Sequence, residues 1–135
     1  MTVSVTVDDG CGIAFYGRRQ SRDAVLLKDF AGLAGDREIR VFPYSKKLFD
    51  LHGIACTPSE DPFTGADNSF IFCEITDISS RLSSVDTLII YRWNRRYPAD
   101  LFFNPDLRSL GFTLSESTSF AGKSHEKITR EIYKK

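Results

Sequence analysis

The chain has 135 residues, a formal net charge of +0 and 41% hydrophobic residues, with 11 phenylalanines among them. This length is sufficient for one domain with its own core, and the composition excludes extended disorder. No apolar run approaches the ~20 residues of a membrane-spanning helix, and the N-terminus lacks the basic and apolar segments of a secretory signal. We therefore expect a single domain over residues 1–135, located in the cytoplasm and without a membrane partner.

The cysteines indicate neither a disulfide framework nor a metal site. Cys11, Cys56 and Cys73 are odd in number and widely spaced, and no CxxC pair occurs. We expect free, partly buried thiols. Neither a metal nor a cofactor is predicted from the sequence.

The N-terminal residues indicate a strand hairpin. Residues 2–7 alternate valine with serine and threonine, which is the period of a half-buried strand. Turn-forming residues at 8–10 separate this segment from a second apolar run at residues 13–16. We expect the two runs to pair with each other.

Two helix patterns follow. Ser21 is a candidate N-cap for a helix whose leucines and phenylalanine recur at helical spacing as far as Gly35. A short strand is expected at residues 39–42. Pro43 then begins a second helix, which ends before Gly53.

The second half contains the strongest strand patterns. Residues 57–68 carry prolines, a glycine and acids without periodicity, and predict an exposed loop. Residues 70–75 and 87–93 are rich in aromatic and β-branched residues, which is typical of central strands lying side by side. Residues 111–114 fit an edge strand. Residues 124–135 begin with a candidate N-cap and carry isoleucines one helical turn apart, which predicts a terminal helix.

These elements together predict an α+β fold. Its central sheet is expected to be mostly antiparallel, with two to three helices packed to one side. No internal repeat or low-complexity segment interrupts the pattern.

Acidic residues gather where the chain has no cation. No lysine or arginine occurs between Lys47 and Arg81. A solvated loop explains such a cluster, and the alternative is an acidic face that steers and holds a basic protein. The carboxylates of this face would be Asp50, Glu60, Asp61, Asp67, Glu74 and Asp77.

A second cluster, YRWNRRYP at residues 91–98, combines arginines with aromatic rings. Arg92, Arg95 and Arg96 would track a phosphate backbone in a nucleic-acid binder, but a pI of about 6.7 does not provide the usual basic footprint. In a structural role, Trp93 would continue the buried face of a strand while the arginines point outward or pair with carboxylates. Contact with a protein partner is the third alternative, and nucleic acid is not the expected partner.

Catalytic patterns are sparse. His52 and His125 would act as general base and general acid in a small ribonuclease, with Lys123 beside the phosphate. Nothing in the sequence brings the histidines together, and no HExxH, CxxC, GxSxG or phosphate-loop pattern occurs. We therefore assign no catalytic and no metal-binding residue.

Two segments carry a family resemblance. IIYRWNRRYPADLFF at residues 89–103 and TSFAGKSHEKITREIYKK at residues 118–135 are similar to the C-terminal half of immunity proteins from bacterial contact-dependent growth inhibition systems. The N-terminal half hardly shares this similarity.

The resemblance implies a non-enzymatic inhibitor that binds the toxic C-terminal domain of a cognate effector, often a nuclease. The six carboxylates would meet the toxin's basic cleft, and the three arginines form a second candidate contact patch. The alternative function is a small RNA-binding protein or ribonuclease that uses these arginines with the two histidines. The motif residues, as framework of a shared fold, would be Arg92, Trp93, Asn94, Arg95, Tyr97, Pro98, Ser124, His125 and Glu126.

Overall fold

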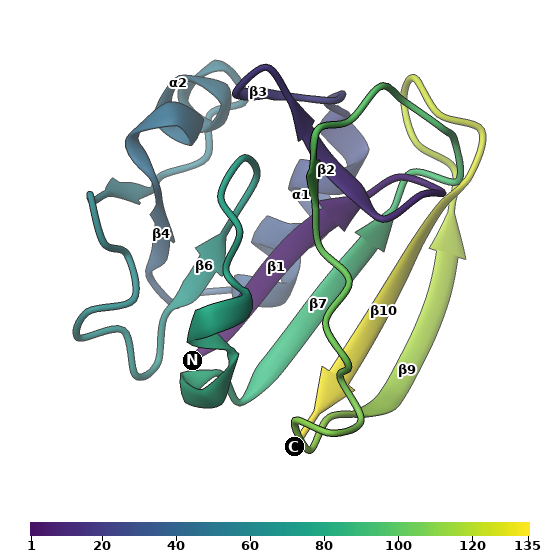
Figure 1. Cartoon of the computed structure of the whole chain (residues 1–135). Helices are drawn as coiled ribbons and strands as arrows, with labels where there is room; N and C mark the ends of the chain where they lie inside the picture. Colours follow the sequence, from purple (N-terminus) through teal and green to yellow (C-terminus); the bar gives the residue numbers. More distant parts are fainter.

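A seven-stranded mixed sheet forms the centre of the molecule (Figure 1). The computed structural model describes all residues, 1–135. The strand order is β5-β4-β6-β1-β7-β10-β9, in which the strands from β5 to β7 are parallel to one another and β10 and β9 are antiparallel to their neighbours. A small second sheet has the order β3-β2-β8.

The elements follow one another along the chain with these bounds: β1 Thr2–Val7, β2 Gly12–Phe15, β3 Arg18–Arg19, α1 Ala24–Ala34, β4 Ile39–Val41, α2 Pro43–Leu51, β5 Thr57–Pro58, β6 Phe70–Phe72, the 3₁₀ helix η1 Ser79–Ser84, β7 Thr87–Arg92, β8 Leu101–Phe102, β9 Thr113–Phe120 and β10 Ile128–Lys134.

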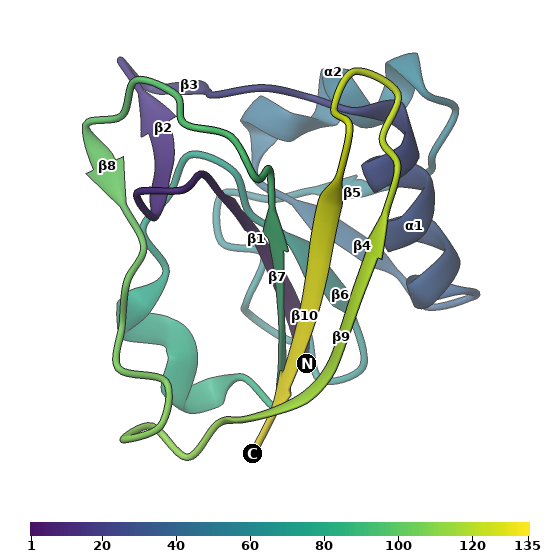
Figure 2. The ribbon, with the colours of Figure 1, turned by 90° about the vertical axis from the view of Figure 1, so that its right-hand side faces the viewer.

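Strand β7 shows that the sheet is covered on both faces. Side chains alternate across a strand, so Leu88 and Ile90 join one core cluster while Ile89 and Tyr91 join the other. The helices α1 and α2 pack on the second cluster, whereas η1 and the small sheet cover the first (Figure 2). This double coverage explains the continuous apolar run at residues 87–91, which is typical of parallel strands.

The first helix is fixed at both ends and along its buried side. Asp23 is its N-cap and accepts the Val25 N–H at 2.9 Å, while Gly35 ends it with a φ of 59°. Phe30 is fully buried, and its ring meets that of Phe72 edge-on at 5.2 Å. The predicted helix is confirmed, but its N-cap is Asp23 and not Ser21.

The prediction of a mostly antiparallel sheet is wrong. Residues 2–7 pair with β6 and β7 in parallel and not with residues 13–16, which belong to the small sheet. β1 also lies between β6 and β7, so these two strands are not neighbours. Turn residues at 8–10 resemble a hairpin locally, but the valines of β1 bury more surface between two parallel strands. The helices are not all on one side, because η1 lies on the face opposite α1 and α2.

The predicted C-terminal helix is strand β10. Ile128 and Ile132 are four residues apart, a spacing that fits one helical turn and also one face of a strand. Arg130 lies between them on that face, and it donates from Nη1 to Asp29 of α1 at 2.6 Å. β7 and β9 supply hydrogen-bonding partners on both sides of β10, and this pairing outweighs the local helix signals.

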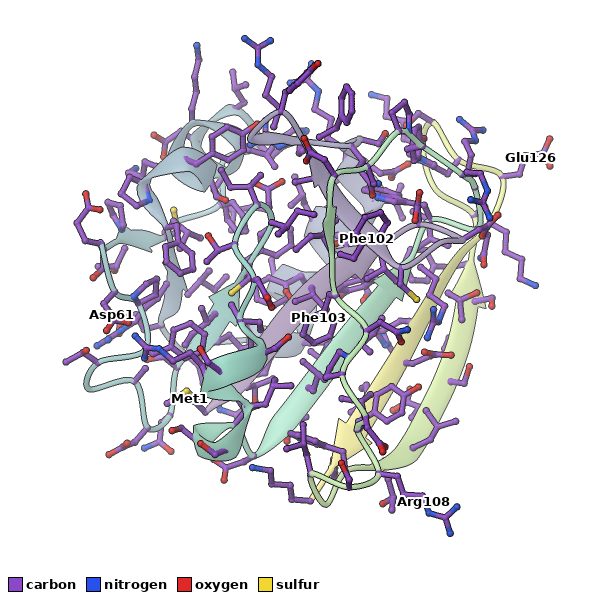
Figure 3. All side chains as sticks on the ribbon, viewed as in Figure 1. Met1, Asp61, Phe102, Phe103, Arg108 and Glu126 are labelled. Carbon is purple, nitrogen blue, oxygen red and sulfur yellow. The ribbon has the colours of Figure 1, made fainter.

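Other expectations are confirmed. α2 begins at Pro43, and the edge strand predicted at residues 111–114 is β9, which begins at Thr113 and continues to Phe120. The loop after β8 inserts Phe103 into the core, while Phe102 stays 52% exposed (Figure 3). No helix has the length and apolar character needed to cross a membrane.

Replacing Phe30 tests the packing of α1 on the sheet. Phe30→Ala should lower the free energy of unfolding by about 3 to 5 kcal/mol, because it leaves a cavity among aromatic rings. Leu51→Ala is the control, since Leu51 is 62% exposed and should cost less than about 0.5 kcal/mol. Urea unfolding of both variants measures the difference, and equal losses would contradict this packing.

Candidate functional site

The carboxyl ends of the parallel strands form one edge of the main sheet, and a pocket lies there. Thr6 of β1, Phe72 of β6 and Trp93 just after β7 line it. In the strand order, β6 and β1 are neighbours. From β1 the chain continues to β4 on one side of this pair, whereas from β6 it continues to β7 on the other side. Ligands of open α/β sheets bind at such switch points.

The pocket is small and mainly apolar. Its cavity volume is about 20 Å³, room for about one water molecule, so a larger ligand would require the pocket walls to move apart. The helices α1 and α2 close one side of it, and the segment from Arg19 to Asp23 closes another. The apolar walls are Ile13, Leu26, Leu27, Leu48, Phe72 and Trp93.

An ion pair forms one polar part of the pocket. Glu74 follows β6 with a side chain only 7% exposed, and Arg19 donates to its two oxygens from Nε at 2.7 Å and from Nη2 at 3.0 Å. Ser45 Oγ donates to the same carboxylate at 2.6 Å. Burial alone would lower the pKa of Arg19, but the bonds to Glu74 outweigh it and raise this pKa above its usual value. Glu74 is therefore held in place as an acceptor.

Gln20 brings a second acceptor into the pocket. Its Oε1 is buried and receives no hydrogen bond, while its Nε2 donates to the carbonyl oxygen of Pro98 over 3.4 Å. A buried amide oxygen without a donor is costly. A ligand N–H at this position would remove that cost.

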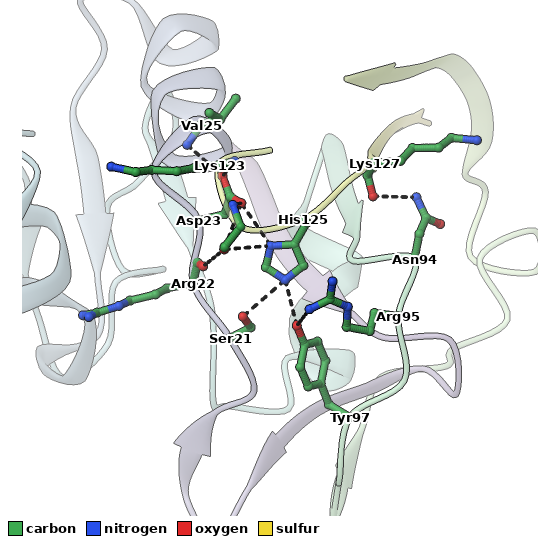
Figure 4. A network of polar contacts seen from close by, with 11 residues as sticks. Ser21, Arg22, Asp23, Val25, Asn94, Arg95, Tyr97, Lys123, His125 and Lys127 are labelled. Carbon is green, nitrogen blue, oxygen red and sulfur yellow. Dashed lines mark hydrogen bonds and ion pairs between the residues drawn. The ribbon is translucent and has the colours of Figure 1, made fainter. Parts of the chain in front are cut away.

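A buried histidine stands next to the pocket (Figure 4). The side chain of His125 is 2% exposed, and its ring stacks on Trp93 at 4.4 Å with an interplanar angle of 20°. Nδ1 lies 3.0 Å from Asp23 Oδ2. Nε2 lies 2.8 Å from the Tyr97 hydroxyl and 3.3 Å from Ser21 Oγ. Three separate parts of the chain therefore meet at one imidazole ring.

Asp23 holds this histidine and the turn before it. Its carboxylate accepts the N–H groups of Val25, Lys123 and Ser124, each at 2.9 Å, in addition to His125 Nδ1–H. Burial would raise the pKa of Asp23, but these hydrogen bonds outweigh burial and keep the pKa well below its usual value. The ionised carboxylate thus requires the proton of His125 on Nδ1, which leaves the lone pair of Nε2 for the hydroxyl groups.

A glycine permits this close approach. A Cβ at Gly122 would lie 2.5 Å from Asp23 Oδ2 and 2.8 Å from Ile128 Cδ1. Both distances are too short for any side chain, so the turn can contact Asp23 only with glycine at this position.

The predicted acidic face is not assembled. Glu60, Asp61 and Asp77 line one hollow, but Arg81 lies in the same hollow and bonds Asp61 at 2.6 Å. Asp77 also uses its Oδ1 to accept the Ser79 N–H at 3.0 Å. The negative charge of the interval between Lys47 and Arg81 is thus partly neutralised by Arg81 itself.

The other three carboxylates lie elsewhere. Asp50 pairs with Lys46 on α2, Asp67 lines a separate hollow, and Glu74 is inside the pocket with Arg19. In Figure 3, Asp61 lies on the opposite side of the molecule from Glu126, which belongs to the turn with the sequence SHEK at residues 124–127 (the SHEK turn). Three of the six carboxylates, Asp50, Asp61 and Glu74, are thus neutralised in separate ion pairs.

The arginine cluster divides in the same way. Arg92 donates from Nε to Glu131 of β10 at 2.8 Å, whereas Arg95 and Arg96 are exposed. Trp93 is 5% exposed, so its predicted burial is confirmed.

The two histidines are not brought together as a catalytic pair. His52 is exposed at the end of α2, where its Nδ1 lies 3.0 Å from the Leu48 carbonyl oxygen. Lys123 shares a hollow with His52, but His125 faces Asp23 inside the fold. No group of three or more metal-ligating side chains occurs.

Sequence reasoning missed the roles of Ser21, Asp23, Tyr97 and Gln20 at this site. One signal was available: had residues 2–7, 70–75 and 87–93 been assigned to parallel strands, their carboxyl ends would have predicted a shared edge. The contact between Asp23 and the SHEK turn had no sequence signal, because about 100 residues separate them.

Comparison with solved structures gives a match over the whole chain. A dihydrofolate reductase from Enterococcus faecalis, complexed with NADP(H) and RAB-propyl, matches with a TM-score of 0.66 and 12% identity, covering 98% of this chain and 94% of that one. No protein-family profile matches the sequence. No curated protein matches it significantly. The comparison therefore shows a shared fold.

This match contradicts the resemblance to immunity proteins. The chain has the α/β fold of an enzyme family, so the expectations of a non-enzymatic toxin inhibitor and of a toxin domain as its partner are wrong. The alternative of an RNA-binding protein or ribonuclease is contradicted by the same match. The segments YRWNRRYP and SHEK, which carry the resemblance, surround His125. Local sequence similarity of this kind does not establish a common fold.

Replacing Asp23 tests the anchor at the site. Asp23→Asn should lower the free energy of unfolding by about 2 kcal/mol or more at pH 7, since charge-assisted hydrogen bonds are lost. The folded-state pKa of Asp23 lies below its unfolded value, near 3.9, so its contribution is complete above about pH 5 and is lost as the pH falls further. Urea unfolding from pH 7 to pH 3 should show the difference from wild type shrinking.

The control for this series is Asp36→Asn, an exposed acid expected to change stability by less than about 0.5 kcal/mol. A wild-type advantage over Asp23→Asn that stays constant between pH 7 and pH 3 would show that the carboxylate is not the anchor.

Proposed function

We propose that this chain is an enzyme that binds a small, flat heteroaromatic substrate of the pteridine class in the pocket at the carboxyl edge of the sheet. The observation that carries the proposal is the apolar pocket at the switch point of this fold, with buried acceptors on its wall. The structural neighbour is named for dihydrofolate, whose head group is a pteridine ring.

The polar groups of the pocket support a ligand rich in N–H donors. Gln20 Oε1 lacks a donor, and the Glu74 carboxylate also lines the pocket. Aminopteridines and similar heterocycles present N–H groups at the rim of a flat ring. The apolar residues Leu27 and Phe72 supply surfaces for the ring faces.

The dinucleotide bound by the structural neighbour fits this chain poorly. After β1, where a phosphate loop would lie, Asp8 Oδ1 already accepts the N–H groups of Gly10 at 2.9 Å and Gly12 at 2.7 Å. Its other oxygen accepts the Tyr97 N–H at 3.0 Å. The Asp8 carboxylate thus occupies the position that a phosphate group of the ligand would need.

The remaining helix N-termini are occupied as well. α2 begins with Pro43, which has no N–H, and Ser45 donates its N–H to Phe42 and its hydroxyl to Glu74. At η1, Asp77 accepts the Ser79 N–H. The residues present do not provide a cradle for the phosphates of NADP(H), and we derive no hydride transfer from this structure.

Fluorescence provides a direct test, because Trp93 is the one tryptophan of the chain and lines the pocket. Titration with dihydrofolate or with a simple aminopteridine should quench its emission with a saturable curve. Titration with NADPH should give no saturable energy transfer from Trp93. Absence of saturable pteridine binding up to millimolar concentration would refute the proposal, and tight NADPH binding would refute the argument about the phosphates.

A variant of Gln20 tests which groups recognise the ligand. Gln20→Leu should weaken pteridine binding at least tenfold, or about 1.4 kcal/mol, because it removes the free acceptor. Asn68→Ala is the control, since Asn68 is an exposed amide in a different hollow. Unchanged affinity in Gln20→Leu would mean that the ligand does not reach this oxygen.

A further inference from the structure

We propose that Ser21, His125 and Asp23 form a nucleophilic triad, in which Ser21 accepts acyl groups from activated esters or amides at the mouth of the pocket. This activity goes beyond the proposed pteridine binding. It depends on the serine and the histidine and not on the Gln20 acceptor, so the two proposals can fail separately.

The geometry matches the roles that such a triad requires. Ser21 Oγ lies 3.3 Å from His125 Nε2, and His125 Nδ1 lies 3.0 Å from Asp23 Oδ2 (Figure 4). The hydroxyl is thus at the far side of the ring from the carboxylate, which is the order of nucleophile, base and orienting acid. Triads are recognised by this geometry and not by sequence motifs, which is why the absence of GxSxG does not exclude one.

The histidine ring is held in the orientation that a general base needs. Asp23 accepts further hydrogen bonds from Lys123 and Ser124, so it stays ionised and fixes the proton of His125 on Nδ1. Stacking on Trp93 prevents the ring from turning away. His125 therefore acts through Ser21 as a base with a fixed direction.

Ser21 is the member of the triad that a substrate can reach. It is half-buried and lines the pocket, whereas the side chains of His125 and Asp23 are 2% and 0% exposed. The N–H groups of Ser21 and Arg22 lie outside every helix and strand and donate to no acceptor of the protein. They are free to stabilise an oxyanion formed beside Ser21.

Tyr97 competes with Ser21 for the same lone pair. Its hydroxyl lies 2.8 Å from His125 Nε2, closer than Ser21 Oγ, and Arg95 Nη1 lies 3.4 Å from the Tyr97 oxygen. The resting state therefore favours the Tyr97 bond, and activation of Ser21 requires that this bond be released. Removal of the tyrosine hydroxyl should increase the reactivity of Ser21.

The chemical step is an ordinary acyl transfer. Ser21 Oγ forms a bond to the carbonyl carbon while its proton moves to His125 Nε2, and the carbonyl π electrons move to the oxygen. When the tetrahedral species collapses, the bond to the leaving group breaks and the leaving group takes the proton from Nε2. Water then repeats the sequence on the acyl-serine, releases the acid and restores the Ser21 hydroxyl.

Covalent labelling tests this directly. Folded wild-type protein incubated with a fluorophosphonate should gain one adduct, as fluoride leaves and a phosphorus–oxygen bond forms, and tandem mass spectrometry should place it on Ser21. Ser21→Ala should abolish the adduct, and His125→Gln should slow its formation at least 100-fold. Tyr97→Phe should speed it at least threefold.

Ser117→Ala is the matched control, because Ser117 is an exposed serine of β9 that does not line the pocket. It should be labelled at the wild-type rate, and the thermal unfolding of every variant establishes that it is folded. No adduct after prolonged incubation, an adduct on another residue, or equal labelling of the folded chain and of Tyr97→Phe would overturn the proposal. Since Ser21 lies in a loop, Ser21→Ala should fold like wild type and keeps the test decisive even if His125→Gln does not.

Discussion

The carboxylate of Asp23 is the interaction on which the site depends. It begins helix α1 by accepting the Val25 N–H, and it receives two backbone N–H groups from the turn at residues 123 and 124. It also fixes the ring of His125. A single buried charge thereby joins the N-terminal helix to the C-terminal hairpin β9–β10. Such a charge is tolerable in the interior only because donors surround it, and loss of any donor would expose the cost of burying it.

This arrangement brings together two segments that are far apart in the sequence. YRWNRRYP follows β7 and places Trp93 against the face of the His125 ring and Tyr97 at its edge, at centroid distances of 4.4 and 6.3 Å. The SHEK turn brings the histidine from the other side, where Gly122 allows contact with Asp23. Both segments therefore contribute to one structural unit, the surroundings of His125. Of these residues Tyr91, Trp93 and His125 are buried, so the two segments supply core residues of this unit as well as exposed ones.

The distribution of charge is the reason for our proposal that this chain does not bind the phosphates of a dinucleotide. Asp8 and Asp77 accept the loop and helix N–H groups that an anion would otherwise use, and Glu74 holds both Arg19 and Ser45. The fold has an apolar pocket at its switch point, but the N–H groups next to Asp8 and Asp77 and the donors of Arg19 and Ser45 are used within the chain. A shared fold thus provides the location of a site, while the residues at that location determine its chemistry.

The sequence by itself determined the elements whose signals are local: helices α1 and α2, the buried runs at residues 70–75 and 87–93 and the burial of Trp93. It did not determine the strand order, because the alternating pattern that contains Val3 and Val5 fits a strand of a hairpin as well as a strand between two parallel neighbours. It predicted a helix where β10 lies, because the four-residue spacing of Ile128 and Ile132 fits one helical turn as well as one face of a strand. Only the tertiary structure placed Arg19 against Glu74, Arg81 against Asp61 and Asp23 against His125. These contacts join residues far apart in the chain, and their energies arise from burial and pairing that no local pattern encodes.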